Sequence, residues 1–146
     1  MKLLITSDVH GHEERLVEVI AKHKDVDFHI NAGDMCLDSH VYQKYHIITV
    51  KGNNDFFTSE PLKRVFDLNG LKVLLTHGHI EHVKHNLDIL KFYAKQLNVD
   101  LVVFGHTHQQ YLEIDQNITI LNPGALGDYH KSYAIYDNGQ VTFYEL

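Results

Sequence analysis

The feature of this sequence that most constrains its fold is a set of five short apolar segments, each followed directly by polar residues that can bind metal. The segments are residues 2–6, 27–31, 46–51, 71–76 and 100–104. A short apolar run bounded by turn residues is typical of a strand buried inside a sheet. In α/β proteins, ligands gather at the carboxyl ends of such strands. The sequence therefore predicts an α/β protein with a polar site at its strand ends.

The segments between the strands predict the rest of the architecture. Helical spacing of apolar residues predicts helices over residues 13–24 and 85–97, and a short helix is expected over 39–45. The pair Asn69-Gly70 between residues 64–67 and 71–76 is a strong hairpin signal. Further strands are expected at 111–114 and 118–121, followed by a final hairpin that turns at 137–139. Without linkers or repeats, residues 1–146 are predicted to form one domain, an α/β sandwich of two mixed β-sheets flanked by helices.

Composition excludes several classes of function. The formal net charge is −6, whereas affinity for nucleic-acid phosphates comes from clustered Lys and Arg, so we expect no nucleic-acid partner. The apolar run at residues 3–5 is too short for a signal peptide or a membrane span. A single cysteine, Cys36, rules out an internal disulfide and fits a reducing compartment. We expect a cytoplasmic protein with no membrane partner, for which a homodimer is compatible with the sequence.

The residues after the five strands form a coherent set of metal ligands. They are Asp8 and His10, Asp34, Asn53 with Asn54 and Asp55, His77, and His106 with His108. In extended backbone, residues two apart point the same way, which pairs Asp8 with His10 and His106 with His108. Glycines at 33, 52 and 105 permit sharp turns and close backbone approach. Carboxylate, imidazole and amide ligands suit Mn, Fe, Zn, Ni or Mg. Each motif is weak alone, but their shared position at strand ends indicates a metal site.

In order, the motifs D-x-H, G-D, G-N-x-D, H-G-H and G-H-T-H resemble those of the calcineurin-like metallophosphoesterase superfamily. The short length and the segment 122–124, Asn-Pro-Gly, resemble its small bacterial and archaeal phosphodiesterase branch. The resemblance implies the metallophosphoesterase fold and two divalent metal ions, with manganese the first choice. It implies that one metal is held by Asp8, His10, Asp34 and His108, and the other by Asp34, Asn53, His77 and His106.

The resemblance also implies a mechanism for a small phosphate-ester substrate. Asp34 would bridge the two metals, and a metal-bridging hydroxide would attack phosphorus. Asp55 would orient a site residue through hydrogen bonds. Asn54 and Asp55 are the candidate catalytic residues.

Asn54 departs from the family pattern, in which many members carry His and the small branch often carries Cys. An amide can donate a hydrogen bond but cannot protonate a leaving group at neutral pH. Two dications would contribute four positive charges, and Asp8, Asp34 and a hydroxide would contribute three negative ones. The remaining single positive charge would be neutralised by a phosphodiester, which carries one negative charge. A phosphodiesterase is therefore expected. A phosphomonoesterase or nucleotide phosphatase is the alternative, followed by a non-enzymatic scaffold that keeps the fold.

Other residues receive plainer interpretations. His82 and His85 are expected at a solvated helix start, and Cys36 is expected to be a packed thiol rather than a ligand. The segment 129–131, Tyr-His-Lys, is a weaker candidate for substrate contact.

Overall fold

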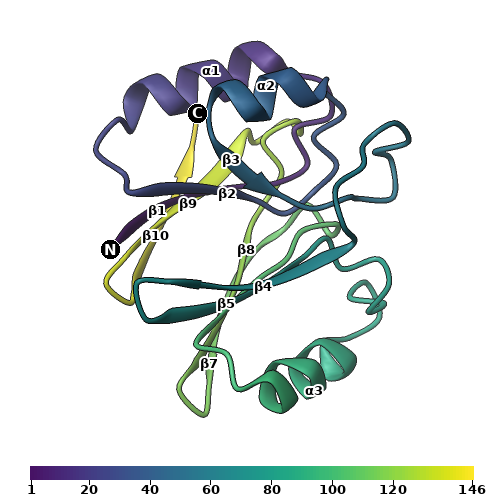
Figure 1. Cartoon of the computed structure of the whole chain (residues 1–146), viewed down its shortest axis with the longest axis vertical. Helices are drawn as coiled ribbons and strands as arrows, with labels where there is room; N and C mark the ends of the chain where they lie inside the picture. The colour runs from purple at the N-terminus through teal and green to yellow at the C-terminus, as the bar shows by residue number, and fades with distance from the viewer.

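The computed structural model describes all 146 residues, in which two five-stranded sheets stack face to face between helices (Figure 1). The elements are β1 (Lys2–Thr6), α1 (Glu13–Lys22), β2 (Phe28–Asn31), α2 (Ser39–Lys44), β3 (Ile47–Thr49), β4 (Lys63–Leu68), β5 (Leu71–Thr76), α3 (Asp88–Leu97), β6 (Leu101–Val103), β7 (Gln110–Asp115), β8 (Ile118–Pro123), β9 (Ser132–Asp137) and β10 (Gln140–Glu145). None of the helices combines the length and apolar character that a membrane crossing needs.

Both sheets are mixed, as predicted. The first, sheet A, has the order β10-β9-β1-β2-β3, with β1, β2 and β3 parallel and β9 antiparallel to β1. The second, sheet B, has the order β4-β5-β6-β8-β7, with β5, β6 and β8 parallel between antiparallel edge strands. Parallel strands end at the same edge of a sheet, so the loops after β1, β2 and β3 are neighbours, as are those after β5 and β6.

Successive side chains of the central strands point to opposite faces of each sheet, and this alternation divides the hydrophobic core into three layers. Leu3 and Ile5 of β1 belong to the cluster between the sheets, whereas Leu4 packs in the cluster with α1 and α2. In sheet B, Leu74 packs in the cluster with α3. Figure 1 shows α1 and α2 over the outer side of sheet A and α3 below sheet B. Because both faces of the central strands are covered, their sequences are continuous apolar runs.

The largest difference from the sequence prediction is at the start of α3. The helix begins at Asp88 rather than at 85, and the preceding segment forms turns. Glu81 in this segment is buried, accepts a hydrogen bond from Thr76 Oγ1 at 3.0 Å and pairs with Lys63 at 3.3 Å. A buried carboxylate needs such partners. These contacts fix the turn at Glu81 to β4 and β5.

Candidate metal centre

The loops after β1, β2, β5 and β6 bring together five of the predicted ligands. Two overlapping groups form, Asp8 with His10 and His108, and Asp8 with Asp34 and His77, and within each group the ligand atoms lie within 4.8 Å of one another. Strands of both sheets contribute, since Asp8, His10 and Asp34 follow strands of sheet A and the other two histidines follow strands of sheet B.

Asp8 lies at the centre of this cluster. Its Oδ1 atom is 3.2 Å from His108 Nε2, 3.5 Å from His10 Nε2 and 3.9 Å from His77 Nε2. Its Oδ2 atom accepts hydrogen bonds from the Ser7 hydroxyl and the His106 backbone amide. Oδ1 is buried and has no hydrogen-bond partner. The free oxygen of a fixed carboxylate therefore points at three imidazole nitrogens.

Asp34 belongs to the second group and also approaches the first. Its Oδ2 atom lies 3.3 Å from His77 Nε2 and 3.9 Å from His10 Nε2. Asp8 is the residue common to the two groups, whereas the family resemblance gives the bridging role to Asp34. Atoms at these separations are close enough to share ions whose bonds to nitrogen and oxygen are about 2.0–2.2 Å long.

Two histidines have the side-chain arrangement that metal ligands adopt. His77 Nδ1 donates to the Ala32 carbonyl at 2.8 Å, so its buried Nε2, which has no hydrogen-bond partner, faces the cluster. His108 Nδ1 is 3.2 Å from Asp128 Oδ2, while its Nε2 faces Asp8. A metal-bound histidine typically donates its other ring nitrogen to a carboxylate or a carbonyl, which fixes the tautomer and the ring orientation.

The last two predicted ligands lie at the margin of the cluster. The ring of His106 is 5.0 Å, centroid to centroid, from that of His77. Asn53 is exposed on the loop after β3, and its side chain makes none of the hydrogen bonds seen within the cluster.

Asn54 and Asp55 have clearly different contacts. Asn54 donates its side-chain amide to Asp34 Oδ2 at 2.9 Å and its backbone amide to Oδ1 at 2.8 Å. Asp55 contacts backbone amides only, accepting from Asp34 and Gly52 at 2.7 Å and from Cys36 at 2.9 Å. Asn54 therefore touches a candidate ligand directly, whereas Asp55 fastens the loops after β2 and β3 together.

The electrostatics keep the carboxylates ionised and one histidine neutral. Burial raises the pKa of the Asp34 carboxyl, but His77 and Asn54 outweigh burial and bring that pKa to about 2. For Asp8, too, burial is outweighed by His10 and His108, and its pKa is lowered. Burial, followed by the adjacent His77, lowers the pKa of His106 to about 4. Ionised carboxylates and neutral imidazoles are the forms that bind metal.

The backbone of the site is not extended, contrary to the geometry predicted for the D-x-H and H-x-H pairs. Asp8, His10, His106 and His108 have φ values of 52°, 50°, 71° and 64°. Their side chains converge through left-handed turns rather than through strand alternation. Left-handed conformations cost about 1–3 kcal/mol in residues other than glycine and persist where surrounding contacts enforce them, often at functional sites.

Two glycines allow the loops to approach the carboxylates. A Cβ atom at Gly52 would lie 2.1 Å from Asp34 Oδ1, and one at Gly105 would lie 2.0 Å from Ser7 Oγ. The prediction of close backbone approach at these positions is confirmed.

Sequence reasoning missed three residues that support the cluster. Ser7 holds Asp8, Asp128 holds His108, and Asn122 donates to the Gly105 carbonyl at 3.1 Å and to Thr107 Oγ1 at 3.0 Å. Asn122 falls in the Asn-Pro-Gly segment, and Asp128 lies directly before the segment 129–131. The only sequence signal for these two residues was that they lie in or next to segments already singled out as candidates. Cys36, predicted to be packed, is exposed overall. Partial desolvation of its thiol, followed by the charge of Asp55, raises the pKa of that thiol to about 12.

Comparison with known proteins agrees with this geometry. Residues 1–140 match the model of the calcineurin-like phosphoesterase superfamily domain. The probable metallophosphoesterase YsnB of Bacillus subtilis is 32% identical over 99% of this chain and 91% of its own length. The phosphodiesterase MJ0936 of Methanocaldococcus jannaschii is 28% identical over 85% of this chain and 83% of its own length. A predicted phosphoesterase from Streptococcus pneumoniae superposes with a TM-score of 0.88 at 28% identity, covering 99% of this chain and 88% of that one.

Proposed function

Because the chain belongs to the calcineurin-like phosphoesterase superfamily, we propose that it hydrolyses phosphodiesters with two divalent metal ions held by the Asp–His cluster. The family is metal-dependent and acts on small phosphate esters. The observation that carries the proposal is the pair of buried atoms Asp8 Oδ1 and His77 Nε2, which face each other at 3.9 Å without hydrogen-bond partners. Buried polar atoms without partners are rare, and two bound cations, one at each atom, would satisfy them.

The proposed ligand sets are those that the family resemblance implies, and the two Asp–His groups of the structure supply five of their seven members. Asp8, His10, Asp34 and His108 hold the first metal, and Asp34, Asn53, His77 and His106 hold the second. Manganese is the first choice, and Ni, Mg, Fe or Zn also suits a site of carboxylate, imidazole and amide ligands without thiolate. The exposed free Cys36 fits a reducing compartment such as the cytoplasm.

When bound, the metals supply Lewis-acid activation of water and of the phosphoryl group. The side chains of the protein do the remaining work. Asp8 and Asp34 provide negative charge at fixed positions, and Asp55 keeps the backbone of Asp34 in place. Asn54 places an amide donor beside Asp34, where it can bond a phosphoryl oxygen on substrate binding. It cannot deliver a proton to a departing alkoxide.

The charges around the cluster support the preference for diesters. Every ion pair that involves Asp8 or Asp34 is with a histidine, and none is with Lys or Arg. The permanent cation that acts on the cluster is Lys84, which lowers the pKa of His106 but pairs with neither carboxylate, so a monoester dianion finds little compensation for its second charge. A diester carries a single negative charge and needs less compensation.

The test is metal-dependent turnover of bis(p-nitrophenyl) phosphate and p-nitrophenyl phosphate, with bound metal measured on the same samples. We expect the diester to be the better substrate and about two metals per chain. Asp34→Asn should abolish turnover and lower the metal content, whereas the exposed surface change Asp25→Asn should alter neither. If Asp34→Asn keeps both metals and full turnover, the assignment of Asp34 is wrong.

The same assay examines Asn54. Asn54→His introduces a group that can act as general acid. General acid catalysis typically increases the reaction rate by about 10²–10⁴-fold. We expect it to improve monoester turnover relative to diester at unchanged metal content. Faster monoester hydrolysis by the unmodified chain would indicate the monoesterase alternative. No turnover of either ester by the metal-loaded protein would indicate the scaffold.

A further inference from the structure

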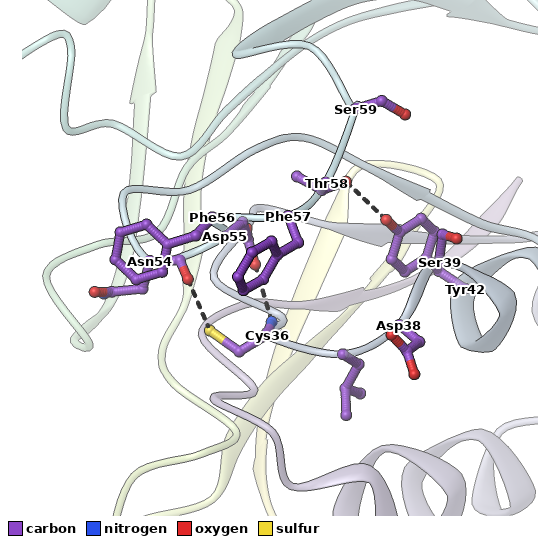
Figure 2. Close-up of a pocket in the computed structure, with 11 residues that line it drawn as sticks. Cys36, Asp38, Ser39, Tyr42, Asn54, Asp55, Phe56, Phe57, Thr58 and Ser59 are labelled. Carbon is purple, nitrogen blue, oxygen red and sulfur yellow. Dashed lines mark hydrogen bonds between the residues drawn. The ribbon is translucent and has the colours of Figure 1, made fainter.

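A cleft of about 550 Å³ is lined in part by Asn54 and Asp55, which follow the candidate ligand Asn53 (Figure 2). It is lined by residues 36–39, by Tyr42 of α2 and by residues 54–59 of the loop after β3. Asn54 belongs both to this lining and to the metal centre, because its side-chain amide bonds Asp34 Oδ2 at 2.9 Å. The cleft and the proposed phosphate site therefore share Asn54.

Two aromatic rings are presented at this cleft without protein partners to cover them. Phe56 is 73% exposed and Phe57 is fully exposed. In Figure 2 both rings lie on the loop that continues from Asn54 and Asp55, with Tyr42 and Asp38 across from them. Burial of a phenylalanine is strongly favourable, so adjacent exposed rings beside a candidate active site indicate a surface that a ligand covers.

The loop that carries the rings is fixed at both ends. Asp55 accepts the backbone amides of Gly52 and Cys36, and Thr58 Oγ1 shares a hydrogen bond of 2.7 Å with the Tyr42 hydroxyl. The rings therefore extend from an anchored loop. An anchored loop reduces the ordering cost of ligand binding.

The remaining lining residues limit what the ligand can be. Asp38, Ser39 and Ser59 supply hydrogen-bonding groups, whereas no Lys, Arg or His lines the cleft. Aromatic faces suit a flat ring, and the polar side chains suit the heteroatoms at the edge of that ring or the hydroxyls of an attached sugar. Without a cation, the cleft disfavours a second phosphate. This combination matches an uncharged nucleoside group rather than a hydrocarbon chain or a polyphosphate.

We propose that the cleft binds the nucleoside substituent of a phosphodiester substrate, with the base against Phe56 and Phe57. The inference rests on the proposed function, because it requires the phosphate to be held at the metal cluster. It adds a substrate class, namely esters in which one substituent on phosphorus is a nucleoside.

The test compares two diesters with the same leaving group, thymidine 5′-(p-nitrophenyl phosphate) and methyl p-nitrophenyl phosphate. Wild-type protein with Mn should favour the thymidine ester in kcat/KM. Stacking of a base on aromatic side chains corresponds to roughly 5- to 150-fold in affinity. The double variant Phe56→Ala/Phe57→Ala should lower the ratio of the two kcat/KM values by roughly tenfold at the low end of that range. The matched control is Phe92→Ala, which removes a ring that is 59% exposed on α3 and should leave the ratio unchanged.

An unchanged ratio in the double variant at full metal content would overturn the inference. If both kcat/KM values also stay at their wild-type level, the rings take no part in turnover. If both fall equally, the shared nitrophenyl ring, or the loop geometry around Asn54, accounts for the effect.

A binding measurement separates this inference from the proposed function. Calorimetry with adenosine 5′-monophosphate and with inorganic phosphate should give tighter binding of the nucleotide by wild type and a smaller difference for the double variant. If neither ester is hydrolysed, the proposed function fails, and the nucleotide measurement still decides the role of the cleft. Equal binding of nucleotide and phosphate by wild type would refute it.

Discussion

Replacement of Asp128 by Asn should weaken one of the two proposed metal sites and leave the other intact. Asp128 Oδ2 lies 3.2 Å from His108 Nδ1, and Asp128 Oδ1 accepts the Tyr129 amide at 2.6 Å. Asn has only one acceptor oxygen. It can keep the Tyr129 contact or the His108 contact, but not both. If the loop turn is kept, a donor amide faces the Nδ1–H of His108, and the orientation that leaves Nε2 free for metal is no longer favoured.

The magnitude follows from the type of contact and its exposure. Loss of a group that orients a metal-binding histidine typically costs 10- to 100-fold in affinity, roughly 1.4–2.8 kcal/mol. The side chain of Asp128 is 44% exposed, and solvent screens part of its interaction. We therefore expect a loss near the low end of that range, about tenfold.

The assay is Mn titration with a competing chelator, resolved into two binding steps. Only the step that involves His108 should weaken, because His77 is oriented by the Ala32 backbone carbonyl instead. Glu145→Gln is the matched control, since Glu145 forms a similar pair with the exposed His130 at 3.4 Å. Equal weakening of both steps, or of neither, would refute the reasoning.

Two further predictions concern packing and acid stability. Gly52→Ala places a methyl group 2.1 Å from Asp34 Oδ1, so it should lower Mn affinity and destabilise the fold by about 1–3 kcal/mol in denaturant titrations. Gly139→Asn, at a turn with nothing within 4 Å of an added Cβ but with φ at 92°, should strain the backbone without changing Mn affinity, and an equal loss of Mn affinity at both positions would contradict this explanation. Burial lowers the pKa of His29 to about 3. Because this folded-state pKa lies below the unfolded value, the free energy of unfolding is highest above about pH 6.5 and decreases as the pH falls toward the folded-state pKa. At pH 5 the free energy of unfolding is lower by about 2 kcal/mol. The metal-free His29→Gln variant should therefore lose less stability than metal-free wild type between pH 7 and 5. An identical pH dependence of the two proteins would show that His29 does not cause the acid sensitivity.

The strands, and the polar residues that follow each of them, could be predicted because they depend on local sequence. β5 matches its predicted bounds, and the hairpin at Asn69-Gly70 is confirmed, with both residues at positive φ. Local pattern could not predict the start of α3. The segment around Glu81 is held by contacts with Thr76 and Lys63, which no periodicity in the segment itself reveals.

The same limit applies to the site. The types of residue that converge follow from the strand ends, but the way in which they converge depends on left-handed turns that strand alternation does not describe. The contact of Asp128 with His108 joins residues 20 positions apart, and that of Asn122 with Gly105 joins residues 17 apart. Such contacts appear only once the loops are positioned by the sheets.

The order of strands in sheet A bears on how the protein matures during synthesis. Sheet B is built from the continuous stretch 63–123, whereas β1 lies between β2 and β9, a strand that begins at Ser132. The loop before β9 also fixes the Asp8 turn, since the amides of Leu126 and Gly127 donate to the carbonyls of Ser7 and Asp8. A nascent chain can therefore assemble sheet B while β1 still lacks one neighbour. The hydrogen bonds that fix the Asp8 turn can form only after the ribosome has added the loop before β9, so the proposed metal centre is completed late in synthesis.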